Sequence, residues 1–161
     1  MSSRPITSQP TRRKVLLLGS TGSIGTSALK VARDIPERME IVGLAAHRSV
    51  EALIAQVQET GVKQVSLTDE ASAARARALL PADVVIHVGE QGLVDLVQAS
   101  DADMVLVAIV GVAGLAPALA AIEAGKHLAV ASKEILVMAG EAVMEAAKRR
   151  GVDILPVDSE H

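Results

Sequence analysis

The 161-residue sequence contains no cysteine, phenylalanine, tyrosine or tryptophan. Without thiols the chain forms no disulfide, and any metal ion must be bound by oxygen or imidazole ligands. Without aromatic rings there is no platform on which nucleic-acid bases stack, and the net charge of −3 provides no excess of basic side chains for phosphate contacts. The composition therefore argues against a nucleic-acid partner.

Long apolar runs are also absent. No stretch reaches about 18 uninterrupted apolar residues, which a membrane-spanning helix needs, and the polar first residues lack the apolar segment of a signal peptide. We therefore expect a cytoplasmic protein with no membrane contact. Half of the residues are apolar, enough for one core, and because these are all aliphatic we expect close helix-on-sheet packing and a ligand held mainly by backbone groups.

Strand-like and helix-like patterns alternate along the chain. Short apolar runs predict buried strands, and apolar residues at helical spacing predict helices between them. This alternation predicts an α/β fold: a Rossmann-like, doubly wound, mostly parallel sheet of about seven strands with helices on both faces. The predicted strands are 14–19, 39–46, 64–68, 83–88, 102–110, 127–132 and 152–157, and the predicted helices are 23–34, 50–59, 70–80, 93–99, 116–123 and 140–150.

The two ends of the chain differ from its middle. Residues 1–12 are polar, carry two prolines and show no periodicity, which predicts a disordered lead-in to a domain over residues 13–157. The chain stops directly after the last predicted strand, where the ligand crevice of a parallel sheet begins. We therefore expect residues 158–161 to be the start of a catalytic domain whose remainder is absent.

The segment GSTGSIG, residues 19–25, joins the first predicted strand to the first predicted helix. Gly19 permits a tight turn, Gly22 lets the backbone approach a pyrophosphate, and Gly25 lets the helix sit close to the sheet. The spacing differs from the commonest G-x-G-x-x-G fingerprint, so a plain structural turn is the alternative, but the strand-to-helix position favours dinucleotide binding. The hydroxyls expected to help cradle the phosphates belong to Ser20, Thr21 and Ser23.

The residues after the second predicted strand indicate which dinucleotide is bound. An NAD site places Asp or Glu there for the ribose hydroxyl, whereas this chain has His47, Arg48 and Ser49. Arginine forms bidentate contacts with phosphate oxygens, which suits the 2′-phosphate of NADPH. Most surface arginines are solvated loop charges, but the position of Arg48 favours NADP.

Asp158 and Glu160 follow the last predicted strand, two residues apart, so that an extended segment puts both carboxylates on one side. Such hard oxygen donors suit a divalent cation, Mg²⁺ or Mn²⁺. An ordinary polar loop explains them about equally well. Lys133, beside Glu134, is a candidate for holding an anionic substrate, although such pairs are usually solvated. The histidines His87 and His127 are expected to be ordinary strand residues.

Four motifs follow one another along the chain: GSTGSIG, AIVGVAGL at 108–115, ASKEILVMAGE at 131–141 and LPVDSEH at 155–161. Together they resemble the 1-deoxy-D-xylulose 5-phosphate reductoisomerase family, and LPVDSEH is the most specific of them. That family uses NADPH and a divalent cation to rearrange and reduce 1-deoxy-D-xylulose 5-phosphate to 2-C-methyl-D-erythritol 4-phosphate, in the non-mevalonate isoprenoid pathway. The resemblance implies the same cofactors, a phosphosugar substrate and a homodimeric full-length enzyme.

The resemblance also implies roles for single residues. Those implied to bind NADPH are Thr21, Gly22, Ser23 and Ile24 at the pyrophosphate, His47, Arg48 and Ser49 at the 2′-phosphate, and Ser132 and Glu134 at the nicotinamide side. Those implied to act on the substrate or the cation are Lys133 and Glu160 as catalytic residues, Lys133, Ser159 and Glu160 as substrate ligands, and Asp158 and Glu160 as metal ligands.

Some positions depart from the usual pattern of that family. Ser132 stands where Asn is common, Ile135 where Ser or Thr is frequent, and His47 with Arg48 where Gly-Lys is frequent. The family's third metal carboxylate, phosphate pocket and closing flap have no counterpart here, so we expect the chain alone to be inactive. The alternatives are another NADP-dependent oxidoreductase, such as a homoserine-dehydrogenase-like protein, and a stand-alone nucleotide-sensing module.

Overall fold

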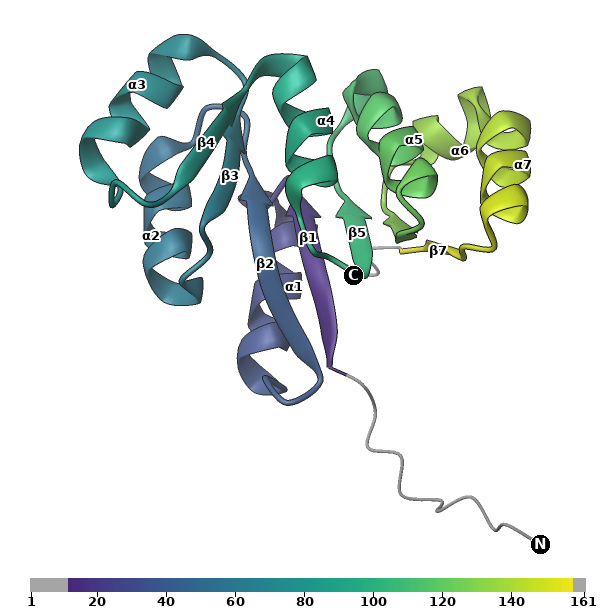
Figure 1. The fold of residues 1–161 in the computed structure, drawn as a ribbon, viewed down its shortest axis with the longest axis horizontal. Coiled ribbons are helices and arrows are strands. Elements are labelled where there is room, and N and C mark those ends of the chain that lie inside the picture. Colours follow the sequence, from purple (N-terminus) through teal and green to yellow (C-terminus); the bar gives the residue numbers. More distant parts are fainter. Residues whose placement is uncertain (1–11, 158–161) are drawn as a thin grey trace, which may run out of the picture.

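The computed structural model describes residues 12–157. Within them, seven parallel strands form one sheet in the order β4-β3-β2-β1-β5-β6-β7 (Figure 1). The predicted Rossmann-like, doubly wound sheet of about seven strands is confirmed. The predicted disordered lead-in lies outside the described residues, apart from Arg12. None of the helices in the described range has the length and apolar character of a membrane span.

The elements alternate along the chain as the sequence pattern predicts. The strands are β1 (Arg13–Leu18), β2 (Met39–Ala45), β3 (Gln64–Leu67), β4 (Val85–Val88), β5 (Met104–Val107), β6 (His127–Val130) and β7 (Ile154–Pro156). The α-helices are α1 (Ser23–Asp34), α2 (Val50–Thr60), α3 (Glu70–Leu79), α4 (Gly89–Ala99), α5 (Leu115–Glu123), α6 (Lys133–Met138) and α7 (Gly140–Arg150), and η1 (Gly111–Gly114) is a short 3₁₀ helix.

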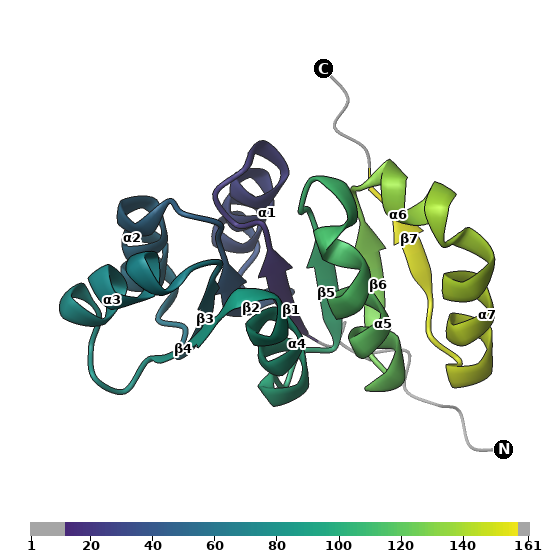
Figure 2. The ribbon, with the colours of Figure 1, turned by 90° about the horizontal axis from the view of Figure 1, so that it is seen from above.

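Helices cover both faces of the sheet, as predicted. Seen from above, α1 and α2 lie on one side of the strands, and α4 and α5 on the other (Figure 2). The central strand β1 shows the reason, because successive side chains of a strand point to opposite faces. Val15 and Leu17 belong to the same core cluster as residues of α1, α2 and α3, whereas Leu16 and Leu18 belong to the cluster that includes residues of α4, α5, α6 and α7. A strand buried on both faces therefore carries a continuous apolar run.

Most predicted element bounds lie within two residues of the observed ones, and the larger differences concern β5, α4 and α6. β5 ends at Val107, earlier than predicted, because the chain continues into η1. α4 begins at Gly89, earlier than predicted, because glycines occupy its first turn and resemble a loop. α6 was not predicted at all, because six residues are too few to reveal helical periodicity.

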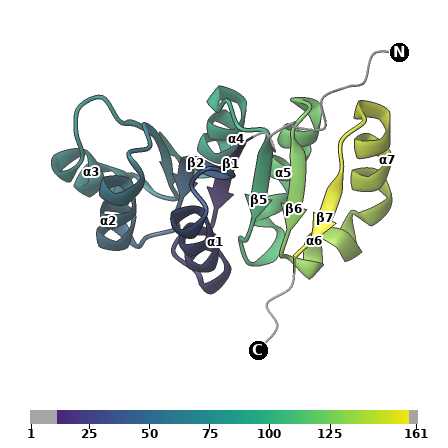
Figure 3. The same ribbon diagram turned by 90° about the horizontal axis from the view of Figure 1, so that it is seen from below.

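The order of the strands creates a switch point beside β1. β2, β3 and β4 add to one edge of β1, and the chain then returns to the other edge to add β5, β6 and β7. Figures 2 and 3, viewed from opposite directions, show β1 and β5 side by side at the centre of the sheet. Doubly wound sheets bind their ligands in the crevice outside the carboxyl ends of the strands at this point.

Candidate functional site

The phosphate loop, residues 19–22, leads from the carboxyl end of β1 into α1. Gly19 has a φ of 94°, a conformation that glycine adopts without steric cost, and a Cβ there would lie 2.5 Å from the Ala108 carbonyl oxygen. A Cβ at Gly25 would lie 2.2 Å from the carbonyl oxygen of Gly19. Both glycines are thus required by contacts within the chain, between the loop, α1 and the segment after β5.

Gly22 is different, because no contact within the described chain requires it to be glycine. Its φ of −81° suits any residue, it is exposed, and the nearest atom to a Cβ would be the Gly19 carbonyl oxygen at an ordinary 3.8 Å. The space beside the Gly22 backbone is therefore open to a ligand. Close approach of a phosphate to this backbone is the role predicted for Gly22, so the loop fits a dinucleotide pyrophosphate.

The start of α1 supplies hydrogen-bond donors beside that space. Within residues 12–157, no side chain caps its first turn and no acidic residue lies in it. The first N–H groups of a helix have no partner within the helix, and the helix dipole favours negative charge there. Thr21 is half-buried and Ser23 is exposed, so both are accessible at the loop, whereas the side chain of Ile24 packs partly against the core.

Ser20 corrects one expectation from the sequence. Its hydroxyl is completely buried and has no hydrogen-bond partner among the described residues, so it does not cradle a phosphate. The backbone of Ser20 is held instead: its N–H donates to the Ala45 carbonyl and its carbonyl accepts from Gln56 Nε2, each at 2.9 Å. Sequence reasoning missed Gln56, because its partner is 36 residues away and a lone glutamine on a helix carries no local signal.

His47, Arg48 and Ser49 lie together between β2 and α2, and all three are exposed. Because β2 is next to β1 in a parallel arrangement, this loop and the phosphate loop lie at the same edge of the sheet. His47 Nδ1 lies 2.7 Å from Thr68 Oγ1, and Arg48 Nε lies 3.1 Å from Asp69 Oδ2. The loop between β3 and α3 therefore supports both side chains predicted to bind the 2′-phosphate.

Asp69 is a fixed anion beside Arg48. Hydrogen bonds from the backbone N–H and the hydroxyl of Ser72 lower the pKa of Asp69, with a smaller contribution from Arg48. Both members of the Arg48–Asp69 pair are substantially exposed, so the pair adds little to stability. The contact places the guanidinium beside the loop between β3 and α3. Sequence reasoning missed Asp69, although an Asp just before a predicted helix is a recognisable N-cap signal.

Ser132, Lys133 and Glu134 lie where β6 ends and α6 begins. The Ser132 hydroxyl donates to Glu134 Oε2 at 2.7 Å, and this bond lowers the pKa of Glu134. Lys133 lies between them and is exposed. β6 pairs with β5, so these residues share the carboxyl edge of the sheet with the phosphate loop but lie on the opposite side of the switch point from Arg48.

The sequence and the fold are matched by known proteins. A family model described as 1-deoxy-D-xylulose 5-phosphate reductoisomerase matches residues 15–140. The chain belongs to this family. A curated reductoisomerase from Thermoanaerobacter sp. (strain X514) is 48% identical over 149 residues, which cover 92% of this chain and 39% of that relative. Family membership decides against the homoserine-dehydrogenase-like alternative.

Solved reductoisomerase structures share the fold. The 1-deoxy-D-xylulose 5-phosphate reductoisomerase from Zymomonas mobilis in complex with NADPH is 38% identical, with a TM-score of 0.85 over 95% of this chain and 40% of that one. A reductoisomerase in complex with magnesium is 38% identical, with a TM-score of 0.86 over 94% of this chain and 38% of that one. The chain thus spans about two fifths of the length of the reductoisomerases it matches.

The predicted reductoisomerase metal and substrate ligands of the last motif lie outside the described residues; they are Asp158, Ser159 and Glu160. Within residues 12–157, no three His, Cys, Asp or Glu residues are grouped so that they could hold a metal ion. His87 and His127 lie on β4 and β6, as predicted. His87 Nε2 lies 2.7 Å from Gln64 Oε1, and His127 Nδ1 accepts a hydrogen bond from the Asp153 N–H at 2.9 Å.

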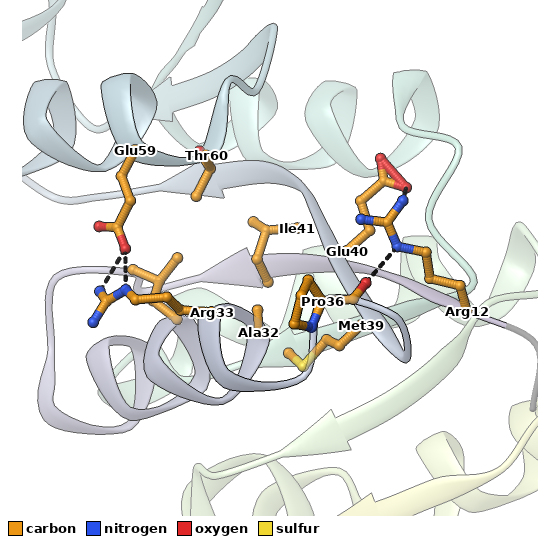
Figure 4. Close-up of a pocket in the computed structure, with 10 residues that line it drawn as sticks. Arg12, Ala32, Arg33, Pro36, Met39, Glu40, Ile41, Glu59 and Thr60 are labelled. Atoms are coloured by element: carbon orange, nitrogen blue, oxygen red, sulfur yellow. Dashed lines mark hydrogen bonds and ion pairs between the residues drawn. The ribbon is translucent and has the colours of Figure 1, made fainter.

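A hollow of about 250 Å³ lies at the opposite edge of the sheet, where β1 and β2 begin and α1 and α2 end (Figure 4). Its charged side chains are paired with one another. Arg33 Nη2 lies 2.5 Å from Glu59 Oε1, and Arg12 Nη1 lies 3.3 Å from Glu40 Oε1. The hollow is therefore separate from the loops that the reductoisomerase motifs identify.

Proposed function

We propose that this chain is the NADPH-binding part of a 1-deoxy-D-xylulose 5-phosphate reductoisomerase. The complete enzyme converts 1-deoxy-D-xylulose 5-phosphate to 2-C-methyl-D-erythritol 4-phosphate by rearrangement and reduction. The observation that carries the proposal is the open space beside Gly22, next to the uncapped start of α1 at the switch point. The solved reductoisomerase with bound NADPH supports the same cofactor.

The proposed roles of the chain's own residues are to bind and orient the dinucleotide. NADPH, when bound, supplies the hydride. The backbone of Thr21 to Ile24 binds its pyrophosphate, and Gly19 and Gly25 shape that loop. His47, Arg48 and Ser49 bind the 2′-phosphate. Residues of the 132–134 segment meet the nicotinamide side, where Ser132 holds the carboxylate of Glu134 in place and the exposed ammonium of Lys133 is available to an anionic substrate.

A divalent cation, Mg²⁺ or Mn²⁺, is proposed at Asp158 and Glu160, with Ser159 and Glu160 touching the phosphosugar. The reductoisomerase structure with magnesium supports this part of the proposal. Turnover requires the chain length that the relatives have in addition, so we expect the 161-residue chain alone to be inactive. The homodimeric complete enzyme and the cytoplasmic location stay predictions, and no observation favours the stand-alone sensing module.

Calorimetric titration of the chain with NADPH and with NADH tests the proposal. NADPH is expected to bind more tightly, because only NADPH carries the 2′-phosphate. A hydrogen bond to a charged group contributes about 1.5–3 kcal/mol, which corresponds to roughly a tenfold to hundredfold difference in affinity. Equal affinities would contradict the role of Arg48, and no binding of either dinucleotide would contradict cofactor binding by this chain.

The variant Arg48→Ala, titrated in the same way, tests whether Arg48 provides the preference for NADPH. This variant is expected to lose most of the preference for NADPH while its affinity for NADH stays unchanged. Arg149→Ala is the matched control, because Arg149 is an exposed arginine on α7 at the other end of the sheet. A preference that survives Arg48→Ala would place the specificity elsewhere in the chain.

A further inference from the structure

We propose that Gln56, on α2, is a positioning residue for the dinucleotide site. Its carboxamide fixes the peptide that joins Ser20 to Thr21 and thereby directs the N–H of Thr21, in the phosphate loop, toward the ligand. This inference rests on the proposed binding of NADPH. None of the four motifs quoted in the sequence analysis includes Gln56.

Gln56 is a buried polar residue on the face of α2 that packs on the sheet. It is 8% exposed, and its neighbours on that face, Leu53 and Val57, belong to the apolar core. A carboxamide in such a place costs free energy unless it is hydrogen-bonded. The bond that Gln56 makes, from Nε2 to the Ser20 carbonyl at 2.9 Å, leads out of the core to the phosphate loop. In a buried setting water does not compete for this bond.

Because the peptide bond is planar, the bond from Gln56 to the Ser20 carbonyl also fixes the direction of the next N–H group in the loop. In a trans peptide, the carbonyl of one residue and the N–H of the next point in opposite directions. Because Gln56 holds the Ser20 carbonyl, the N–H of Thr21 is directed away from Gln56. The two preceding peptides are fixed as well, since the N–H groups of Gly19 and Ser20 both donate to the Ala45 carbonyl at 2.9 Å.

Helix α2 also connects the two loops proposed to bind the cofactor. It begins at Val50, directly after the loop that holds Arg48, and it reaches the phosphate loop through Gln56. Two buried side-chain atoms at this junction, Ser20 Oγ and Gln56 Oε1, have no hydrogen-bond partner among residues 12–157. Unpaired buried polar atoms are rare in proteins, and a functional role of the residue is one of the reasons for which they occur.

The variant Gln56→Leu removes the donor and retains a buried side chain of similar size. Gln58→Leu is the matched control, because it makes the same substitution at an exposed position on the same helix. Each variant is titrated with NADPH and with adenosine 2′-monophosphate, which carries the 2′-phosphate but no pyrophosphate. We expect Gln56→Leu to weaken NADPH binding about tenfold and to leave binding of adenosine 2′-monophosphate unchanged. Gln58→Leu should change neither.

The comparison of the two ligands separates positioning from a purely structural role. Equal losses for both ligands, or unchanged NADPH affinity in Gln56→Leu, would overturn the proposal. If thermal unfolding shows that Gln56→Leu does not fold, Gln56→Met carries the same test with a more flexible apolar side chain. Absence of NADPH binding by the unsubstituted chain would instead refute the proposed function, and the positioning role with it.

Discussion

The three glycines of the GSTGSIG motif are equally spaced in the sequence, but the structure requires them for different reasons. Gly19 and Gly25 are fixed by atoms of the chain itself, because an added Cβ would lie 2.5 Å and 2.2 Å from carbonyl oxygens. Gly22 has no such neighbour, since the closest atom would be 3.8 Å away. Stability therefore accounts for two of the glycines, and the proposed ligand accounts for the third.

Alanine at each of two positions tests this distinction. Gly25→Ala is expected to lower the free energy of unfolding by about 1–3 kcal/mol, because the new methyl group overlaps the loop backbone. Gly22→Ala is expected to change it by less than about 1 kcal/mol, since a less flexible unfolded chain offsets a poorer N-cap, and yet to weaken NADPH binding. Thermal unfolding and calorimetric titration measure the two effects. A Gly22→Ala chain with normal NADPH affinity would show that the ligand does not use this space.

Local sequence signals predicted where the site residues lie, but not what holds them. The glycine spacing and the ends of the strands placed Gly22 and Arg48 in loops at one edge of the sheet. Their individual contacts with a ligand stay predictions. The burial of Ser20, its bond to Gln56 and the pairing of Arg48 with Asp69 depend on residues 21 to 36 positions apart, and no local pattern encodes such contacts.

Among the elements, those with clear periodicity and clear end signals were predicted best. α1 and α7 have the predicted bounds, Ser23–Asp34 and Gly140–Arg150. α6 was missed because the apolar residues 135–138 form an unbroken run, which shows no 3.6-residue period. In sequence, such a run resembles a buried strand. Tertiary contacts distinguish the helix, because they place Ile135 in the core and leave Val137 exposed.

The contact between η1 and α6 gives an element-scale prediction. A Cβ at Gly114 would lie 2.7 Å from Val107 Cγ1 and 2.8 Å from Ile135 Cδ1. Gly114→Ala is therefore expected to lower the free energy of unfolding by about 1–3 kcal/mol. Ile135→Val removes the Cδ1 atom, so the cost of Gly114→Ala should be smaller in that background.

Urea unfolding of the four proteins in a double-mutant cycle measures this coupling. The cycle subtracts the separate effects of Gly114→Ala and Ile135→Val, so what remains is the coupling between the two positions. Strictly additive effects would mean that Val107 alone resists the new methyl group and that α6 can move away from η1.

For the molecule as a whole, exposed apolar side chains gather near the carboxyl edge of the sheet. Val137 and Met138 on α6 are 82% and 67% exposed, and Val110 and Val112 beside or within η1 are 89% and 59% exposed. Several exposed apolar side chains on neighbouring elements are typical of an interface. Since the chain spans about two fifths of the length of its relatives, we expect additional chain to cover this surface in a complete reductoisomerase.

The chain alone is therefore expected to self-associate as its concentration rises. A double variant with Val137→Lys and Met138→Lys should shift sedimentation toward the monomer, because burying charged side chains between two copies costs free energy. Val31→Lys is the control, since Val31 is an exposed apolar residue on α1. A chain that stays monomeric at every concentration, or a control that acts as strongly as the double variant, would contradict a role for this surface.

β1 lies at the centre of the sheet, between β2 and β5. During synthesis, β1 therefore gains the partner on one side long before the partner on the other. β2, β3 and β4 follow β1 directly along the chain, but the other edge of β1 pairs with β5, whose Val105 lies opposite Leu16. Until Met104–Val107 have been synthesised, that edge and the face that packs with α5 and α7 lack their partners. The nascent chain is then most open to aberrant strand pairing, and synthesis that pauses before residue 104 prolongs this state.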